Sequence, residues 1–525
     1  MTDNGIDRVP VVVVGGGPTG ITVATLLAQY GIDTLVLDRW AQVYPQPRAV
    51  HLDDEIFRVL AQLGVATEFA AISRPAHGLR LLDRDLSVLA EFHRDTKLSR
   101  NGFPGANMFD QPELEQLLRT NMTRFPHARF RGDIEVLDIT AGPAGPIRLT
   151  TMDRRSEQKS TIIADYVLGC DGASSTVRQA IGSPMRNLKF DQRWLVVDIA
   201  TTADLRQWEG VHQICDPHRA GTYMRIGDTR YRWEFRLLAD ESADDYRTLA
   251  TLRPLINPWT NRVPDRDLEL LRVAEYTFRA QIAQRWRSGN IFLLGDAAHL
   301  TPPFIGQGMG AGLRDAMNLA WKLAGVHTGS LPPAMLDTYE QERKPHARHM
   351  IGLALNMGRA MTAGGELGIA VRRLVAPRLH LIPGLRSKVF DSQTPALRSS
   401  ALTQRTFCTS RIAGKLCLNP QIGRDTRLDD LLGNAFGLIT TTAPTPQQQA
   451  MVEGRGARVY FAAAGSELAG WLQRGHAAAA IIRPDRTVMR AGRDVNELCA
   501  ALPPLPAAST GARPNSTPAH ADPHE

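Results

Sequence analysis

Three glycines near the N-terminus, Gly15, Gly17 and Gly20, have the GxGxxG spacing of a loop that binds the pyrophosphate of a dinucleotide. In such a loop the first glycine allows a tight turn, the second lets the phosphates approach the backbone, and the third lets a helix pack closely on a sheet. Free N–H groups at the start of that helix then hold the phosphates. Asp38 follows at the distance from which a carboxylate accepts hydrogen bonds from a ribose diol. The sequence therefore predicts a dinucleotide site.

The elements around these glycines are those that the motif requires. The run Pro10–Val14 is rich in β-branched residues and predicts a buried strand, with the proline as its first residue. A helix is expected over Ile21–Tyr30, ended by Gly31. A second strand over Ile32–Leu37 then leads to Asp38. Because these elements occur in order, a β-α-β unit is favoured over an isolated glycine turn.

Two later segments carry acidic turns after short apolar strands, which are predicted over Tyr166–Gly169 and Ile291–Gly295. The first strand is followed by CDGASSTVR at Cys170–Arg178, and the second runs into GDAAH at Gly295–His299. Their order and spacing resemble class A FAD-dependent aromatic hydroxylases of the phenol hydroxylase branch, over residues 11–348. The resemblance implies tightly bound, non-covalent FAD, and it implies these contacts: Gly15, Gly17, Pro18, Gly20, Asp38, Arg39, Arg48, Gln111, Asp171, Arg178, Gly295, Asp296, Pro303, Gly306 and Gly308.

Several candidate residues have a second, structural interpretation. The resemblance implies that Asp171 and Arg178 serve both FAD and the nicotinamide, but the two could instead form a structural ion pair. His299 is either a site residue or a core histidine satisfied by the backbone. The candidates for catalysis are His51, as the group that deprotonates the phenol, and Pro302.

The resemblance implies a monooxygenase that adds one oxygen atom of O2 to a phenolic acid, ortho to an existing hydroxyl. The chain has one complete GxGxxG, and the resemblance implies that NADH, with NADPH as the alternative, has no Rossmann site of its own and visits transiently. The phrases at Pro47–Asp53, Arg232–Phe235 and Gly312–Leu323 are similar to a subgroup that converts 3-(3-hydroxyphenyl)propionate and 3-hydroxycinnamate to 2,3-dihydroxy products in aromatic catabolism. The alternatives are hydroxylases of another phenol, a resorcinol or a polyketide antibiotic, and a flavin epoxidase. A non-catalytic flavin-binding module is disfavoured because the chain has all three motifs: the GxGxxG, the segment Cys170–Arg178 and the segment Gly295–His299.

The cysteines argue against thiol and metal chemistry. None of the five forms a CxxC pair, so a disulfide reductase, a disulfide framework and a zinc site are all disfavoured, and no metal is expected. A reducing cytoplasm fits this pattern best. The cysteines are Cys170, Cys215, Cys408, Cys417 and Cys499.

The expected fold class is α/β, with a Rossmann-like FAD-binding domain, an inserted sheet-rich substrate domain and a C-terminal thioredoxin-like appendage without CxxC. The alternation of Tyr231, Trp233 and Phe235 with charged residues predicts a half-buried strand in the insert, whose aromatic side favours core over substrate wall. The expected ranges are 8–76, 106–185 and 285–350 for the FAD domain, 77–105 and 186–284 for the substrate domain, 351–393 for a helical connector, 394–501 for the appendage and 502–525 for a disordered tail.

Composition sets outer limits on the function. The chain has 525 residues, 43% hydrophobic and 22% charged, as expected for a soluble protein of several domains. Its net charge of +7 comes from residues 371–415, which hold nine Lys and Arg against Asp391 alone. We interpret this stretch as a solvated basic surface, with attraction of anionic ligands as the alternative. No nucleic-acid module, membrane span or signal sequence is recognised, and a homodimer is left open.

Overall fold

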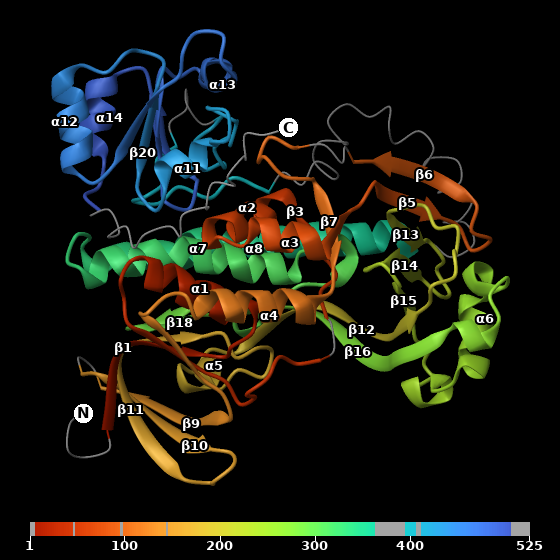
Figure 1. The fold of residues 1–525 in the computed structure, drawn as a ribbon. Coiled ribbons are helices and arrows are strands. Elements are labelled where there is room, and N and C mark those ends of the chain that lie inside the picture. The colour runs from red at the N-terminus through yellow and green to blue at the C-terminus, as the bar shows by residue number, and fades with distance from the viewer. Residues whose placement is uncertain are drawn as a thin grey trace, which may run out of the picture.

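The fold is described by a computed structural model for residues 6–45, 48–94, 98–142, 145–362, 394–405 and 411–505. These residues form four β-sheets, and Figure 1 shows the long helices lying between the first sheet and the C-terminal part of the chain. This layering arises because the apolar face of a sheet and the apolar face of a helix are each buried by packing against another element.

The first sheet has eight strands and a mainly parallel centre, in the order β17-β18-β11-β1-β2-β8, with β10 and β9 attached through β11. The valines of β1 are buried on both faces, as parallel strands require. Its strands are β1 (Ile6–Val14), β2 (Thr34–Leu37), β8 (Ala128–Arg131), β9 (Ile134–Ala141), β10 (Ile147–Asp153), β11 (Lys159–Gly169), β17 (Arg287–Ser288) and β18 (Ile291–Leu293).

Pro10 lies inside β1 and not at its first position, which corrects the sequence-based prediction. The strand pairs with β11 from Ile6 onward, whereas its pairing with β2 begins only at Val11. The proline therefore stands where β1 has a neighbour on one side only, and its missing N–H removes no ladder hydrogen bond on the open side.

Several helices pack against this sheet and against one another. The first helix begins at Pro18 and is followed by Gly31 with φ of +75°, the left-handed conformation expected after a helix end. It packs against α7, and α7 in turn packs against α8. The helices of this part are α1 (Pro18–Gln29), α2 (Asp54–Leu63), α3 (Ala66–Ile72), α4 (Gln111–Met122), α5 (Thr176–Ala180), α7 (Gly308–His327) and α8 (Asp337–Thr362).

A second eight-stranded sheet has the order β19-β16-β12-β15-β14-β13-β5-β6. Tyr231, Trp233 and Phe235 pack with α6 (Leu249–Thr260) on one face, so the core interpretation of this aromatic stripe is confirmed. Both predicted substrate-domain segments contribute strands to this sheet. The strands are β5 (Gly78–Leu82), β6 (Val88–His93), β12 (Met185–Ala200), β13 (Val211–Ile214), β14 (Gly221–Arg225), β15 (Arg230–Arg236), β16 (Glu269–Ala283) and β19 (His299–Leu300).

A small third sheet, β3-β7-β4, places the segment after Arg48 beside α2. Its strands are β3 (His51–Asp53), β4 (Ser73–Pro75) and β7 (Ala106–Phe109). In the register of this sheet His51 lies opposite Met108.

The C-terminal unit, residues 411–505, forms a four-stranded sheet in the order β21-β20-β22-β23. Figure 1 shows it in blue, above α7 and away from β1 and β11. Phe436 meets Trp321 of α7 edge-on at 5.3 Å between ring centroids. The elements are α11 (Leu428–Leu432), β20 (Gly437–Thr440), α12 (Pro446–Gly454), β21 (Arg458–Phe461), α13 (Glu467–Arg474), β22 (Ala479–Ile482), β23 (Val488–Gly492) and α14 (Val495–Ala501). Its thioredoxin-like character and the domain boundaries stay predictions.

Three further expectations concern the ends of this unit. Leu502 and Leu505, at the start of the predicted tail, are buried in its core, and residues 506–525 lie outside the described residues. The predicted connector coincides with the end of α8 as far as Thr362, and residues 363–393 are likewise not described. Most of the basic stretch 371–415 falls there too.

Within the described ranges, no helix is long and apolar enough to cross a membrane.

Candidate active site

All three glycine-acid motifs meet at one edge of the first sheet, which we call the cofactor edge. It consists of the carboxyl ends of β1, β11 and β18 together with the turns that follow them. Cys170 N donates to Val14 O at 2.7 Å, and Leu294 N donates to Gly169 O at 2.9 Å. In an open α/β sheet this is the edge at which ligands bind.

The GxGxxG glycines occupy positions that larger residues could not. Gly15 has φ of +104°, and a β-carbon on it would collide with the carbonyl oxygen of Cys170. A β-carbon on Gly20 would collide with the carbonyl oxygen of Gly15. Gly17, by contrast, faces open space at the N-terminus of α1, with no heavy atom within 4 Å of a β-carbon built there. This open approach to the free N–H groups after Pro18 fits a pyrophosphate.

Asp38 joins the glycine loop to the end of β2. Its Oδ2 accepts a hydrogen bond from Gly16 N at 2.6 Å, and its Oδ1 accepts one from Trp40 N at 2.8 Å. The half-buried carboxylate retains further lone pairs, so it fits a ribose diol. The neighbouring Arg39 is exposed.

Asp171 and Arg178 do not pair with each other. Asp171 accepts hydrogen bonds from Ser175 Oγ at 2.5 Å and Val177 N at 3.1 Å, and burial raises the pKa of its carboxyl. The guanidinium of Arg178 donates to Ala297 O at 3.1 Å and to a nearer carbonyl in its own motif. The structural ion pair considered as an alternative is thus absent between these two described residues, and Arg178 instead ties the second motif to the third.

Asp296 carries an exposed side chain at the cofactor edge, yet the pKa of its carboxyl is raised because the surrounding protein desolvates it. The positive charges of His299 and Arg48 act in the opposite direction. Arg48, itself exposed, therefore lies near enough to Asp296 to influence it, although the two are far apart in sequence. A carboxylate in this setting is available to a polar ligand that displaces water.

Asp315 of α7 holds the third motif in place, and sequence reasoning did not single it out. It accepts hydrogen bonds from Gly295 N at 3.0 Å and Arg343 Nε at 2.8 Å, and it lies 2.7 Å from His299 Nε2. His299 is buried and stacks on Trp286 at 5.1 Å, so it is a core histidine, with a carboxylate as its partner where the backbone was expected. In the sequence, the feature that could have pointed to Asp315 is that it is the one acidic residue of the helix Gly308–His327.

Gln111 positions the backbone that carries Arg48. Its Oε1 accepts hydrogen bonds from Arg48 N at 2.9 Å and Ala49 N at 2.6 Å, while its Nε2 donates to Glu115 at 2.6 Å. The side chain predicted to touch FAD is thus already engaged in holding this loop.

The segment after the third motif turns tightly at Gly306, which has φ of +62°. A β-carbon there would lie 2.8 Å from His51 Nδ1, so this candidate directly borders the turn. Gln307 donates from its Nε2 to Asp53 at 2.9 Å, and its Oε1 accepts a hydrogen bond from Arg314 Nη1 at 2.8 Å. Arg314 also binds Asp53 at 2.7 Å, so a buried triad fixes the turn.

The ends of this turn differ in their surroundings. Pro302 is buried and Pro303 is partly exposed. Gly308 begins α7 and, like Gly17, faces open space. The turn thus presents a second helix N-terminus to the cofactor edge.

His51 is neutral at physiological pH. Burial, together with the charge of Arg94, lowers the pKa of its imidazole to about 4. Arg94 Nη1 lies 3.5 Å from His51 Nε2. A neutral imidazole has the lone pair that a general base needs, but a pKa of about 4 makes it a weaker base than an imidazole that titrates near physiological pH.

The second sheet turns the face opposite α6, here called its inner face, toward this turn. Phe304 meets Trp194 of β12 at 6.0 Å and Phe190 at 5.6 Å between ring centroids. Met224 of β14 packs with Met108, the register partner of His51. The inner face therefore lies over both the Gly306 turn and His51.

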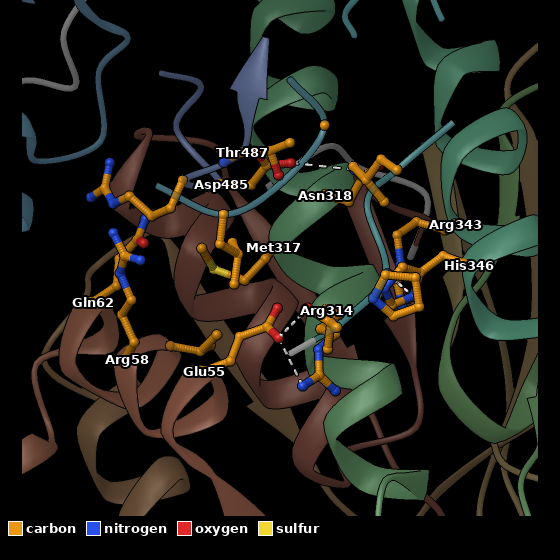
Figure 2. Close-up of a pocket in the computed structure, with 17 residues that line it drawn as sticks. Glu55, Arg58, Gln62, Arg314, Met317, Asn318, Arg343, His346, Asp485 and Thr487 are labelled. Atoms are coloured by element: carbon orange, nitrogen blue, oxygen red, sulfur yellow. Dashed lines mark hydrogen bonds and ion pairs between the residues drawn. The ribbon is translucent and has the colours of Figure 1, made fainter. Parts of the chain in front are cut away.

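A separate cavity of about 50 Å³ lies between α2, α7, α8 and the C-terminal unit. Figure 2 shows Arg314 reaching Glu55 at one end and Asp485 reaching Asn318 at the other. A space of this size holds a few water molecules. Because it is far too small for a dinucleotide, we assign it to packing between the units. Among the residues that the structure describes, no group of three His, Cys, Asp or Glu side chains is placed to hold a metal.

A family model described as FAD binding domain matches residues 8–354, which is more than half of the chain. The chain belongs to the FAD-dependent aromatic hydroxylases. The hydroxylase is 33% identical over 445 residues to the 3-(3-hydroxy-phenyl)propionate/3-hydroxycinnamic acid hydroxylase of Burkholderia cenocepacia, covering 84% of this chain and 80% of that one. It is 32% identical to the probable NADH-specific resorcinol 4-hydroxylase of Rhodococcus jostii, covering 96% and 97%.

Solved structures agree with the family assignment at the level of the fold. The hydroxylase superimposes on the flavin-dependent monooxygenase PieE, in complex with FAD and substrate, with a TM-score of 0.79 at 21% identity over 94% of this chain and 98% of PieE. Aklavinone-11 hydroxylase, in a ternary complex with FAD and aklavinone, gives 0.77 at 22% identity over 96% and 99%. These likenesses confirm the predicted α/β fold class.

Proposed function

We propose that this FAD-dependent monooxygenase hydroxylates a phenolic acid ortho to its existing hydroxyl group, with NADH and O2, and that 3-(3-hydroxyphenyl)propionate and 3-hydroxycinnamate are its substrates. The observation that carries the proposal is the contact between neutral His51 and the Gly306 turn, under the inner face of the second sheet. The names of the relatives support the same substrate class and the choice of NADH.

FAD, the cofactor of the family, supplies electron transfer to O2 and delivery of an oxygen atom to the ring. The chain's own residues bind and orient it. Gly17 and the N-terminus of α1 would receive the pyrophosphate, and Asp38 the ribose. Asp296 and Arg48 would bind the polar chain between phosphate and ring, since the charge of Arg48 reaches the Asp296 carboxyl at the cofactor edge.

His51 would accept the phenolic proton at Nε2, because a phenolate is the more nucleophilic ring. Burial and the charge of Arg94 beside that atom keep the imidazole neutral before the transfer, and they also limit its strength as a base. Burial of the site under the second sheet would exclude water. Transient nicotinamide binding near Asp171 and Arg178, a cytoplasmic location and a homodimer stay predictions.

The test is substrate-stimulated NADH oxidation by the purified holoenzyme, with the product identified by mass spectrometry. We expect at least about tenfold stimulation by either acid, which corresponds to about 1.4 kcal/mol of differential binding between two protein states. The product should be the 2,3-dihydroxy compound. NADH oxidation that is equally fast without an aromatic compound, or hydroxylation of resorcinol but of no meta-hydroxylated acid, would contradict the proposal.

A further inference from the structure

Glu234 of β15 is a mostly buried residue whose carboxyl group accepts no hydrogen bond from the described residues. Its exposed fraction is 8%, and among the described residues none donates a hydrogen bond to its side-chain oxygens. Its neighbour on the same face, Arg232, is held by both oxygens of Asp198 at 2.7 and 2.9 Å. Its oxygens are not among the buried polar atoms that lack both solvent and a partner, so they are available to a hydrogen-bond donor that enters from solvent.

The sheet register places Glu234 in a short polar row. Glu234 lies opposite Thr222 of β14, and Thr222 lies opposite Gln213 of β13. Directly opposite residues of neighbouring strands project from the same face of a sheet. Thr222 Oγ1 and Gln213 Oε1 are joined at 3.1 Å, whereas Glu234 has no such link. The row projects from the inner face, because the alternating residue Trp233 is in the core beneath α6.

The surroundings of this row are apolar on both sides. At one end Leu81, opposite Gln213, packs in a cluster with Phe304. Trp194, on the same face as Glu234, also meets Phe304. Met224 packs with Met108, opposite His51 in the register. The polar row thus lies between the Phe304 turn and the strand that carries His51.

We propose that Glu234, with Thr222 beside it, binds the hydroxyl group of the aromatic substrate and thereby selects hydroxylated rings. This inference rests on the proposed function and names a specificity-determining contact within it. A phenolic O–H is a donor and a carboxylate is an acceptor, so the two are complementary. A substrate carboxylate would be repelled from the same position, which orients the acid group away from Glu234. The aromatic walls formed by Trp194 and Phe304 suit the ring itself.

The experiment separates hydroxyl recognition from general damage to the site. Holoenzyme is titrated with 3-(3-hydroxyphenyl)propionate and with 3-phenylpropionate, which lacks the ring hydroxyl, and binding is followed by the absorbance of the bound flavin. The variants are Glu234→Leu and the nearly isosteric Glu234→Gln. The matched control is Glu275→Gln on β16 of the same sheet, whose exposed side chain pairs with Arg193 at 2.7 Å.

We expect the wild-type enzyme to bind the hydroxylated acid about tenfold or more tightly than its analogue, as one hydrogen bond to a charged group implies. The preference should fall below about twofold in Glu234→Leu and by at least about threefold in Glu234→Gln, where a neutral acceptor remains. The Glu275→Gln control should keep the wild-type preference. If Glu234→Leu does not retain flavin, the Glu234→Gln result alone decides.

An unchanged preference in the Glu234 variants, or an equal loss of affinity for both ligands, would overturn the assignment of Glu234. A wild-type enzyme without any hydroxyl preference would overturn it as well. Those results leave the proposed function standing as long as the hydroxylated acid is still turned over. Failure of the wild-type enzyme to turn over any meta-hydroxylated acid overturns the proposed function itself.

Discussion

At the scale of single residues, Asp296 combines exposure at the cofactor edge with a carboxyl that the protein desolvates. If it binds FAD, Asp296→Ala should weaken FAD affinity about tenfold or more, because a hydrogen bond involving a charged group is worth about 1.5–3 kcal/mol. Flavin retained after ultrafiltration measures the effect. Asp165→Ala, which removes an exposed acid of β11, serves as the control. Full flavin occupancy in the Asp296 variant would rule out the assigned role.

His51 should determine how hydroxylation responds to pH. Its imidazole must be neutral to accept a proton, and its pKa is lowered to about 4, so acidification should inhibit through this group only as the pH falls toward 4. His51→Gln should lower hydroxylation about 100-fold, a typical contribution of a general base, while NADH oxidation continues and hydrogen peroxide forms. Product yield per NADH is the measurement. The control is His93→Gln, which changes an exposed histidine of β6 and should keep the wild-type product yield per NADH. A similar loss of yield in both variants would exclude a specific role for His51.

At the scale of elements, α7 connects the cofactor edge to the rest of the FAD-binding region through Asp315. The carboxylate joins the Gly295 turn to Arg343 of α8, and all of these groups are buried. Asp315→Asn should destabilise the protein by about 3–5 kcal/mol, because Arg343 loses its charge partner in the interior. Thermal unfolding with and without added FAD measures this change.

The pair of exposed Asp337 with the more buried Arg287 provides the comparison for Asp315. Asp337→Asn should cost less than about 1 kcal/mol, as surface ion pairs do. Equal stability of the Asp315 and Asp337 variants would show that α7 does not hold the turn through this contact.

At the scale of the whole molecule, a buried charge network joins the C-terminal unit to α7 and α8. Glu342 of α8 binds Arg483 of the C-terminal unit at 2.8 Å and Lys322 of α7 at 2.7 Å. Arg483→Met should lower the free energy of unfolding by about 3–5 kcal/mol, since Glu342 and Asp485 would remain as buried charges. Chemical denaturation measures this loss, with Arg490→Met, in an exposed pair with Glu497, as the control.

This network lies away from the cofactor edge, so flavin binding should survive in Arg483→Met at low temperature. A stable variant, or one with loss no greater than in the Arg490 control, would contradict an essential docking role for the C-terminal unit. The unit's buried Cys417, whose thiol pKa burial raises to about 12, offers no thiolate for redox chemistry.

The local sequence was sufficient to predict the structure of motifs that span only a few consecutive residues. The roles of Gly15, Gly17 and Gly20 follow from backbone geometry over six residues, and the structure has the crowding at Gly15 and Gly20 and the open space at Gly17 that those roles need. The aromatic stripe of β15 could be assigned to the core because strand periodicity and hydrophobicity are local properties.

Contacts between distant segments could not be predicted in the same way. Three contacts join residues from different elements: the hydrogen bond of Asp315 with Gly295, the close approach of His51 to Gly306, and the hydrogen bond of Gln111 with Arg48. The ion pair of Asp171 with Arg178, considered as an alternative, is replaced by hydrogen bonds within and between motifs for the same reason.

By itself, the sequence determined the cofactor class, the order of the motifs and the α/β character of this hydroxylase. Only the tertiary structure decided which polar groups meet: it left Glu234 on the inner face without a hydrogen bond from the described residues, and it turned Arg178 toward Ala297. The physical reason is that backbone conformation depends on neighbours along the chain, whereas the environment of a charge depends on every element packed around it. Burial and pairing are therefore settled only when sheets and helices assemble.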